Sequence, residues 1–228
     1  MKSPCFLANT ESFFKKKTEL IYNGFDQKTY YPKRNIHLNF RKINKIKRKI
    51  FVLGYAGRYA KQKNIHSIIM SFSKLAKINK NVCLFMVGKD ISIENKDLIK
   101  FVKELKISHK VFFLSEQKNL LDFYNGIDLL ILASHSESFP NVIAESMLCK
   151  TPVLSSNAGC AEKIINSGGF IMRDNKSNTI FKNLMKIINL FQNKRKKWII
   201  LKKNSRSHII KNFSLEIMAE KYMQKWIF

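Results

Sequence analysis

The chain has 228 residues, of which 45% are apolar and 12% aromatic, enough to bury the core of one large α/β domain. This composition excludes a disordered chain, and no run approaches the roughly 18 apolar residues of a membrane-spanning helix. The formal net charge of +26 attracts anionic partners before any specific contact forms. A compositional bias towards Lys, spread over solvated surfaces, is the simpler source of most of this charge.

Apolar strand-like runs alternate with helical segments through the middle of the chain. The pattern predicts strands at 49–56, 82–88, 110–114, 128–133, 152–156 and 168–172. It predicts helices at 64–79, with Asn64 as N-cap, around Leu98 to Leu105, and at 118–125, 140–149 and 161–166. Strands that are apolar throughout and separated by helices indicate a parallel sheet covered on both faces. The predicted fold class is α/β, a Rossmann-like doubly wound sheet.

Two further helices are predicted at the C-terminus. Residues 194–212 form a basic stretch in which apolar residues from Trp198 to Leu201 interrupt the charge, and this stretch could lie on an anionic membrane. Ser214 is expected to cap the next helix, whose apolar face comprises Ile217, Met218, Tyr222, Met223 and Trp226. That face either packs on its own domain or is exposed and recruits a partner.

Cysteine usage indicates the compartment. The four cysteines, Cys5, Cys83, Cys149 and Cys160, form no CxxC pair and have no His at metal-ligand spacing. The apolar stretch CFLA near the N-terminus is too short for a signal-peptide core. We therefore expect reduced thiols, no metal site and a cytoplasmic location, with peripheral association at the inner face of the membrane as an option.

Ligands of such sheets bind beyond the carboxyl ends of the strands, so the loops there hold the candidate site. After the first strand, Gly57 lets the backbone approach a ligand, and Arg58 and Lys63 can reach into the crevice; a solvated basic loop is the alternative. After the strand at 128–133, Ser138, Phe139 and Pro140 lead into a helix start, with Pro140 suited to the first helical position. The free N–H groups of that helix start can bind an anion.

Two carboxylates, Glu137 and Glu145, flank this helix start. A carboxylate accepts hydrogen bonds and donates none, which suits it to the vicinal hydroxyls of a ribose or hexose. Taken singly, Glu137 is explained by the dipole of a helix N-terminus and Glu145 by a surface helix position. Near them, His135 either contacts a donor phosphate or sugar or is satisfied locally.

The motifs taken together carry a family resemblance. A Gly-Arg-x4-Lys loop, then Glu-x7-Glu in ESFPNVIAE, then TPVLSSNAGCAEKI, with IYNGFDQKTYYP upstream, resemble the donor-binding half of a GT-B glycosyltransferase. More narrowly, the chain resembles the retaining GT4 type, glycosyltransferase group 1, which includes capsule, O-antigen and lipopolysaccharide transferases. The resemblance covers residues 18–192, and it departs from the common pattern at Ser115, Lys150 and Cys160.

The resemblance implies a nucleotide diphosphate sugar as donor, retention of anomeric configuration, and no cofactor or metal, since no DxD motif is present. Arg58 and Lys63 would neutralise the leaving diphosphate and Glu137 would touch the transferred sugar, so these three are the expected catalytic residues. Glu145 would accept hydrogen bonds from the ribose. The expected donor site is completed by Gly57, Ser138, Phe139, Pro140 and Asn141.

The resemblance also implies a division of the chain. Residues 1–22 would be the end of an N-terminal acceptor domain, 23–48 a linker, 49–192 the donor domain, and 193–228 basic and amphipathic C-terminal helices. We expect an enzyme of cell-surface glycan synthesis that transfers a sugar to a polysaccharide or lipid-linked acceptor. It would be incomplete on its own and would need a partner carrying the N-terminal half.

Two other functions stay open at this point. The first is a catalytically inactive nucleotide-binding module, or the remnant of a truncated gene. The second is a basic protein of nucleic acid or membrane surfaces; because no aromatic platform or groove-reading helix is recognisable, we expect no nucleic-acid partner. A dehydrogenase is disfavoured because no GxGxxG follows the first strand.

Overall fold

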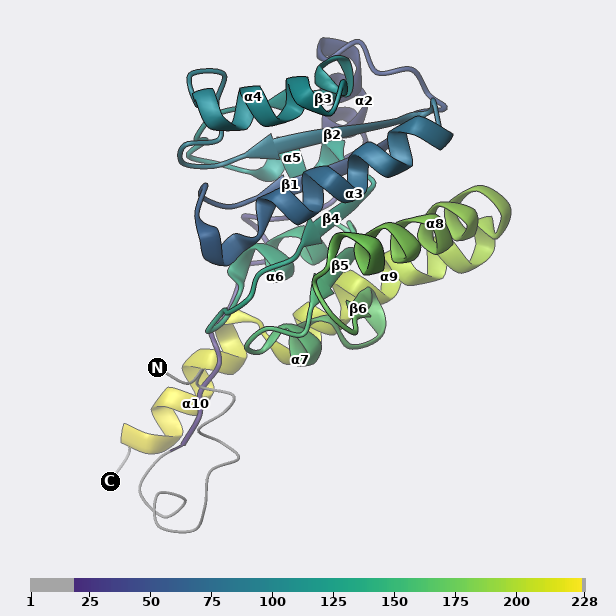
Figure 1. The fold of residues 1–228 in the computed structure, drawn as a ribbon. Helices are drawn as coiled ribbons and strands as arrows, with labels where there is room; N and C mark the ends of the chain where they lie inside the picture. The colour runs from purple at the N-terminus through teal and green to yellow at the C-terminus, as the bar shows by residue number, and fades with distance from the viewer. Residues whose placement is uncertain (1–18, 227–228) are drawn as a thin grey trace.

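A computed structural model of the chain describes residues 19–226 (Figure 1). Most of the predicted acceptor-domain remnant at 1–22 therefore lies outside the described residues. Residues 19–22 contain neither helix nor strand. The chain then forms one layered α/β structure with a short helical extension at the C-terminal end.

The centre of the fold is a six-stranded parallel sheet with the order β3-β2-β1-β4-β5-β6. This order places the switch in connection direction between β1 and β4, as in a doubly wound sheet. All six predicted strands are confirmed, with ends shifted by one or two residues. Their bounds are β1 Phe51–Ala56, β2 Val82–Val87, β3 Val111–Phe113, β4 Leu129–Leu132, β5 Val153–Ser156 and β6 Phe170–Met172.

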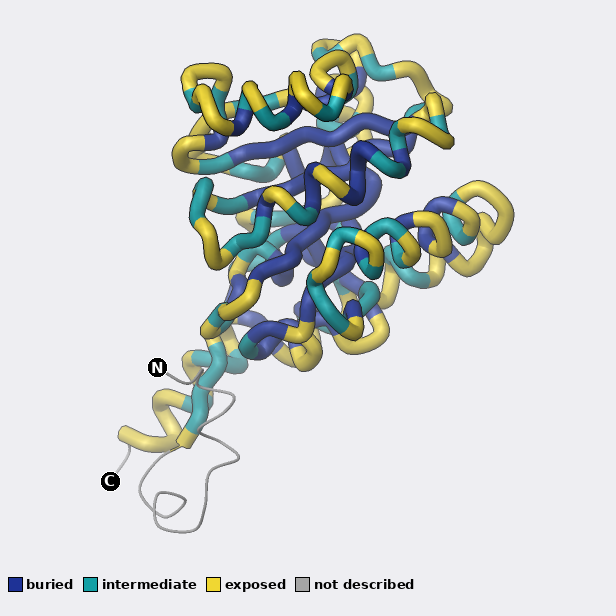
Figure 2. Tube along the Cα trace, in the orientation of Figure 1, coloured by how far each residue is buried: buried dark blue, intermediate teal, exposed yellow. Residues whose placement is uncertain are grey.

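Helices cover both faces of the sheet, so the central strands are buried on both sides (Figure 2). Phe51, Leu53 and Tyr55 of β1 face one core, while Val52 and Ala56 face the other. The first core is covered by α3 Ile65–Ile78, α4 Lys96–Glu104 and α8 Ser177–Asn193. The second is covered by α2 Arg34–Ile43, α5 Leu121–Gly126, α6 Asn141–Leu148, α7 Ala161–Ile165 and α9 Arg195–Asn212.

Two helices were not predicted from the sequence. Helix α2 lies within the predicted linker, where its buried residues are Phe40 and Arg41. Helix α8 follows β6 and buries Ile180, Leu184 and Ile187 along one face. The linker therefore contains an ordered element that belongs to the covering layer of the sheet.

The start of α3 differs from the prediction in one detail. Asn64 occupies the N-cap position but adopts a left-handed conformation (φ 52°) and makes no side-chain cap. Its side-chain amide instead donates to the carbonyl of Asn175 (2.9 Å). Asn64 thus joins the loop after β1 to the loop after β6.

Two of the departures from the family pattern fall at left-handed positions. Lys150, after α6, has φ 60°, and Ser115, after β3, has φ 55°. A side chain with a Cβ is disfavoured in this region, which is why glycine is common there. These positions keep the backbone geometry that glycine serves while carrying other side chains.

The cysteines follow the expectation only in part. Cys83 and Cys149 are free and buried, and burial raises the pKa of each thiol to about 12. Cys160 is disulfide-bonded, so the expectation of four reduced thiols is wrong at this position.

The predicted C-terminal helices are confirmed as α9 and α10 Leu215–Trp226. Ser214 caps α10, since its hydroxyl accepts a hydrogen bond from the N–H of Ile217 (3.3 Å). The backbone at Phe25 pairs with this junction through Phe213 (2.9 Å) and Leu215 (3.3 Å). Helix α10 then extends away from the body with no buried residue (Figure 2), and its expected apolar face is exposed at Tyr222, Met223 and Trp226.

Candidate active site

The loop after β1 forms one wall of the candidate site. It begins at Gly57 (φ 154°), whose N–H donates to the carbonyl of Val87 (2.9 Å). A Cβ on Gly88 would lie 2.2 Å from the Gly57 carbonyl oxygen, so the absence of a side chain lets these two loops touch. Tyr55 Oη donates to the carbonyl of Arg58 (3.2 Å). The base of the loop is thereby fixed, while Arg58 itself is exposed.

An ion pair joins this loop to the loop after β4. Lys63 Nζ lies 2.5 Å from Glu137 Oε1, and the two side chains are only 18% and 12% exposed. Ser134 Oγ donates to the same carboxylate oxygen (2.6 Å). The N–H of His135 donates to the carbonyl of Gln62 (2.8 Å), which ties the two loops together through the backbone as well. The predicted meeting of a cation after β1 and an acid after β4 is therefore present in the structure.

The loop after β5 completes the surroundings of Glu137. The N–H of Cys160 donates to the carbonyl of Ser138 (3.2 Å). A Cβ on Gly159 would lie 2.3 Å from the Glu137 carbonyl oxygen, and Gly159 itself is left-handed (φ 61°). Glycine is therefore required at position 159 for both space and conformation. Close backbone approach in this loop is kept although Cys160 follows.

A fourth loop, after β6, reaches the same edge of the sheet through Asn175. Its side-chain amide donates to the carbonyl of Ala133 (3.2 Å) and lies 3.0 Å from His135 Nδ1. His135 is therefore satisfied locally, which was one of the two explanations left open for it. Four loops thus converge at the carboxyl ends of β1, β4, β5 and β6.

The buried Tyr55 hydroxyl connects Arg58 to this arrangement. Burial raises the pKa of Tyr55 above its ordinary value, the negative charge of Glu137 raises it further, and the positive charge of Arg58 lowers it. Arg58 and Lys63 both stand on the loop that follows β1, so the two expected cations share the carboxyl end of this strand.

Phe139 has a packing role in the free protein. Its ring lies 5.8 Å from that of Tyr22, and 6.1 Å from those of Phe25 and Phe213. This aromatic cluster holds the segment at 22–25 and the α9–α10 junction against the start of α6. Phe139 was predicted as a donor-binding residue; the structure shows it supporting the helix start.

The start of α6 is one residue later than predicted. Pro140 is buried and occupies the position before the helix, and Asn141 is the first helical residue. The Asn141 side-chain oxygen accepts from the amide of Asn23 (3.0 Å). Ser138 is exposed beside them and remains accessible to a ligand. The first turn of α6 points its N–H groups towards this loop, as the start of any helix does.

Glu145 lies just over one turn into α6 and has a partner of its own. Tyr124 Oη donates to its carboxylate (2.7 Å), and burial raises the Glu145 pKa while this hydrogen bond lowers it. Burial, with the Glu145 charge second, raises the pKa of nearby Tyr30 to about 12. The explanation of Glu145 as a surface residue is therefore wrong. In the free protein its carboxylate faces α5, whereas Glu137 faces Lys63.

Sequence reasoning found the charged residues of the site and missed the residues that hold them. Ser134, Asn175 and Tyr124 were not predicted, although each hydrogen-bonds a predicted residue or its loop. Ser134 stands three positions before Glu137, a spacing at which a hydroxyl can reach back to a loop carboxylate. Tyr124 and Asn175 give no such local signal.

Residues 19–226 contain neither a cluster of metal-ligating side chains nor a helix suited to span a membrane. No group of three or more His, Cys, Asp or Glu in that range is placed to hold a metal ion. Over the same range, no helix combines the length and the apolar character needed to cross a bilayer. The absence of a metal requirement stays a prediction.

Comparison with known proteins identifies the family. The family model described as "Glycosyl transferases group 1" matches residues 37–205, so the chain belongs to this family of glycosyltransferases. The capsular polysaccharide biosynthesis glycosyltransferase CapM of Staphylococcus aureus is 29% identical over 153 residues, which cover 65% of this chain and 39% of CapM. The chain thus spans about two fifths of the length of this relative.

Solved structures agree on the fold. Anabaena HepE, solved in complex with UDP-glucose, superposes with a TM-score of 0.81 at 24% identity, covering 97% of this chain and 59% of HepE. The C-terminal domain of the Francisella tularensis group 1 transferase LpcC superposes with a TM-score of 0.71 at 21% identity. That match covers 84% of this chain and 100% of the LpcC domain. The Rossmann-like fold is therefore that of the C-terminal half of a GT-B glycosyltransferase.

Proposed function

We propose that this chain is the donor-binding half of a retaining glycosyltransferase that transfers a sugar from a nucleotide diphosphate sugar to a polysaccharide or lipid-linked acceptor. The observation that carries the proposal is the ion pair between Lys63 and Glu137, formed across two loops 74 residues apart. It brings a cation and a carboxylate together at one edge of the sheet, and these are the groups that a diphosphate and a sugar would need. The relatives support the class of reaction, since CapM is named for capsular polysaccharide synthesis.

The chemistry follows from the charges. Cleavage of the bond between sugar and diphosphate leaves negative charge on the phosphate oxygens, and preorganised cations stabilise that charge. Lys63 has three N–H donors and uses one on Glu137, so two can bind phosphate. Arg58 is exposed on the same loop and can add a second, bidentate contact. Each such contact contributes about 1.5–3 kcal/mol.

Glu137 would bind the transferred sugar. Lys63 and Ser134 hold its Oε1 oxygen, which leaves Oε2 to accept from a sugar hydroxyl. Glu145 would bind the ribose, and for this its carboxylate must give up or share its hydrogen bond with Tyr124. Ser138, Asn141 and the N–H groups of the α6 start would surround the phosphates or the sugar.

This chain matches 39% of the length of CapM, and acceptor binding would belong to the remainder of such a protein. We therefore propose that catalysis needs an acceptor half supplied by further polypeptide or by a separate subunit. Work at the inner face of the membrane would fit a lipid-linked acceptor. If no acceptor half exists, the same site describes an inactive nucleotide-binding module.

A calorimetric panel of UDP-, GDP- and ADP-sugars, together with the free diphosphates, tests the donor site. We expect one nucleotide to bind, and Lys63→Ala and Arg58→Ala each to weaken both the sugar and the diphosphate forms by about tenfold to a hundredfold. Glu137→Gln should remove only the gain in affinity that the sugar provides. Lys61→Ala, an exposed lysine of the same loop, is the matched control and should bind normally.

Two outcomes would contradict the proposal. No binding by any nucleotide in the panel would exclude a working donor site. Equal weakening by Lys61→Ala and Lys63→Ala would show that general charge, and not the placed ammonium, attracts the ligand. Transfer activity after addition of an acceptor half in trans would then separate an enzyme from an inactive module.

A further inference from the structure

A second concave site lies at the opposite edge of the sheet from the donor site. It is a cavity of about 1000 Å³ between α2, the turn after α6 and the first half of α9. Ile50, just before β1, and Asp128, just before β4, lie in its wall, so it opens at the amino ends of the strands. The donor loops follow the carboxyl ends, and the two sites are separated by the length of the strands (Figure 1).

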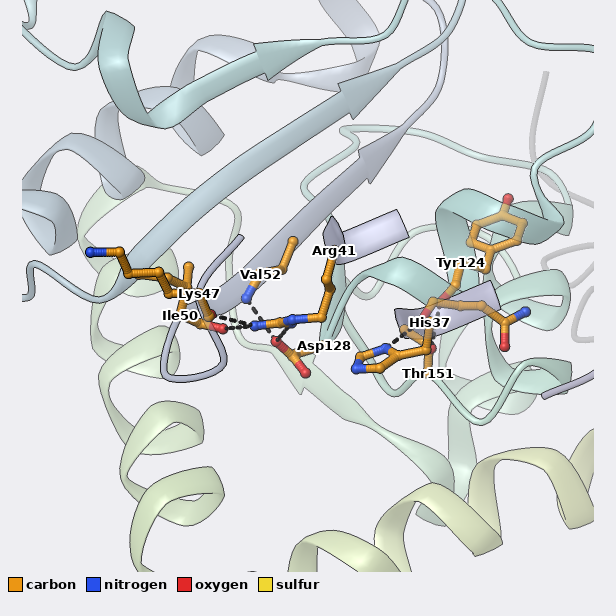
Figure 3. A network of polar contacts seen from close by, with 9 residues as sticks. His37, Arg41, Lys47, Ile50, Val52, Tyr124, Asp128 and Thr151 are labelled. Carbon is orange, nitrogen blue, oxygen red and sulfur yellow. Dashed lines mark hydrogen bonds and ion pairs between the residues drawn. The ribbon is translucent and has the colours of Figure 1, made fainter. Parts of the chain in front are cut away.

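The lining of this cavity is strongly basic. Eight of its sixteen lining residues are Lys or Arg, and its only acid is Asp128. Asp128 is already used, because its Oδ2 accepts from the N–H of Val52 (2.8 Å) and from Arg41 (3.4 Å) (Figure 3). Arg41 also donates to the carbonyls of Lys47 (3.1 Å) and Ile50 (2.6 Å). This pair is a structural tie and offers no free charge to a ligand.

Seven cations are left without an acid. Arg34 and Lys42 come from α2, Arg48 from the loop before β1, and Lys150 from the turn after α6; the other three are on α9. Three ion pairs occur within the described part of the chain, and none of them includes any of these seven residues. Four segments thus bring like charges to one hollow, which is unfavourable unless an anion lies between them.

Lys202 of α9 is half-buried in the wall of the cavity. Burial lowers its pKa; the charges of Arg195 and Lys150 lower it further, and Asp128 opposes them. An ammonium drawn out of water without a partner costs free energy, and such groups are normally paired. Lys150, which also lines the cavity, has a left-handed backbone conformation. A compositional bias towards Lys explains lysines on solvated surfaces. It does not explain why Lys202 is half-buried with Arg195 and Lys150 nearby.

Apolar groups form the rest of the wall. Trp198 is buried against Phe51 and Phe191, with ring centroids 6.2 and 5.4 Å apart. Leu38 and Ile199 also line the cavity and are 55% and 44% exposed. A bare ion would leave these groups in contact with water. Cations mixed with aromatic and aliphatic surface match an anionic group attached to an organic body.

We propose that this cavity binds a phosphate ester, with Arg195, Lys150 and Lys202 around the phosphate and Leu38 and Ile199 against the organic part, beside the buried ring of Trp198. The ester is either a free metabolite or the headgroup of an anionic lipid, which share this chemistry. The site is independent of the donor site and of the function proposed for it.

Trp198 provides a reporter inside the cavity. The chain has two tryptophans, and the other, Trp226, is 83% exposed on α10. In Trp226→Phe, fluorescence therefore reports on Trp198 alone. We would titrate this full-length variant with sn-glycerol 3-phosphate, with phosphatidylcholine vesicles containing phosphatidylglycerol, and with vesicles of phosphatidylcholine alone.

Charge variants then locate the response. Arg195→Gln with Lys202→Gln should weaken binding by about tenfold to a hundredfold, as expected when charge-assisted contacts to a phosphate are lost. Lys182→Gln with Lys186→Gln removes the same charge from exposed positions of neighbouring α8 and should leave affinity unchanged. Lys63→Ala should also leave it unchanged. Circular dichroism and a thermal melt establish that each variant is folded; Arg41 is kept because it ties down Asp128.

The two kinds of probe distinguish a free phosphate ester from a lipid headgroup. Saturable binding of glycerol phosphate supports a free phosphate ester. A response only to vesicles that contain phosphatidylglycerol supports a lipid headgroup. No response to either probe, an equal loss in both double variants, or loss of the response in Lys63→Ala would overturn the proposal.

Discussion

Charged residues are paired at the carboxyl edge of the sheet and are largely unpaired at the amino edge. At the carboxyl edge, Lys63 meets Glu137 across two loops, so this acid and this cation are paired. At the amino edge, Asp128 is tied to Arg41, and the seven other cations of the cavity form no ion pair with a residue between 19 and 226. A chain with 16 acids and 42 basic residues therefore places acids where a ligand needs acceptors as well as cations. At the amino edge, the unbalanced positive charge suits a ligand whose polar group is an anion.

The largest expected effect concerns the tie at the amino edge. Asp128→Ala should lower the free energy of unfolding by about 3–5 kcal/mol, because it leaves Arg41 buried without its counter-charge and removes the acceptor of the Val52 N–H. Urea denaturation measures this. Glu104→Ala, at the exposed end of α4, is the control. A loss no larger than the control's would show that the pair is dispensable.

The next effect concerns the pair at the carboxyl edge. A double-mutant cycle with Lys63→Met and Glu137→Gln should give a coupling free energy of about 1–3 kcal/mol in the free protein, since both side chains are largely sheltered. Chemical denaturation of the four proteins measures it. A coupling near zero would mean that the pair forms only transiently before the donor binds.

A smaller effect is expected at the turn after α6. Lys150→Gly should raise stability by about 1 kcal/mol, because glycine adopts the left-handed conformation without the penalty of a Cβ. For a chain of this size that is about 2–4 °C in Tm. Lys150→Ala removes the same charge and keeps the Cβ, so it should show no such gain. If both variants gain equally, relief of repulsion in the basic cavity is the cause.

The smallest expected effect is a change in pH dependence at Glu145. Burial raises the folded-state pKa of this carboxyl above its unfolded value, so the protonated form stabilises the fold. That contribution is complete below the unfolded pKa and is lost as pH rises through the folded one. Glu145→Gln keeps an acceptor for Tyr124 without the charge. It should flatten stability against pH across this window and raise Tm slightly at neutral pH, as thermal melts from acid to neutral pH would show.

The fold was predictable because apolar runs and helical periodicity follow from burial in a layered sheet. Helix α8 carried the same signal, with Ile180, Leu184 and Ile187 at helical spacing, and was within reach of the sequence. Helix α2 was not, because it buries only Phe40 and Arg41, and an arginine is buried there for its tie to Asp128. The burial of Arg41 depends on tertiary packing against Asp128, which the local sequence around α2 does not indicate.

The site was predictable to a different extent. Parallel strand ends share one edge, so a cation after β1 and an acid after β4 could be expected to meet, and they do. The role of Phe139 was harder, because its partners Tyr22 and Phe213 are far away along the chain. The same holds for Glu145, whose orientation depends on how α5 packs beside α6.

The ion pair between Lys63 and Glu137 also means that Lys63, in the proposed donor site, has a counter-ion before any ligand binds. When a donor binds, the Lys63 ammonium would exchange its contact with Glu137 for a contact with phosphate. Few bound salt ions would therefore be released from that edge of the sheet. The cavity beside α9 has no internal counter-ion of this kind, so its occupancy should fall steeply with ionic strength, over the range where screening shortens from about 30 to 8 Å. Added salt should therefore weaken ligand binding in the cavity beside α9 more strongly than donor binding at the carboxyl edge of the sheet.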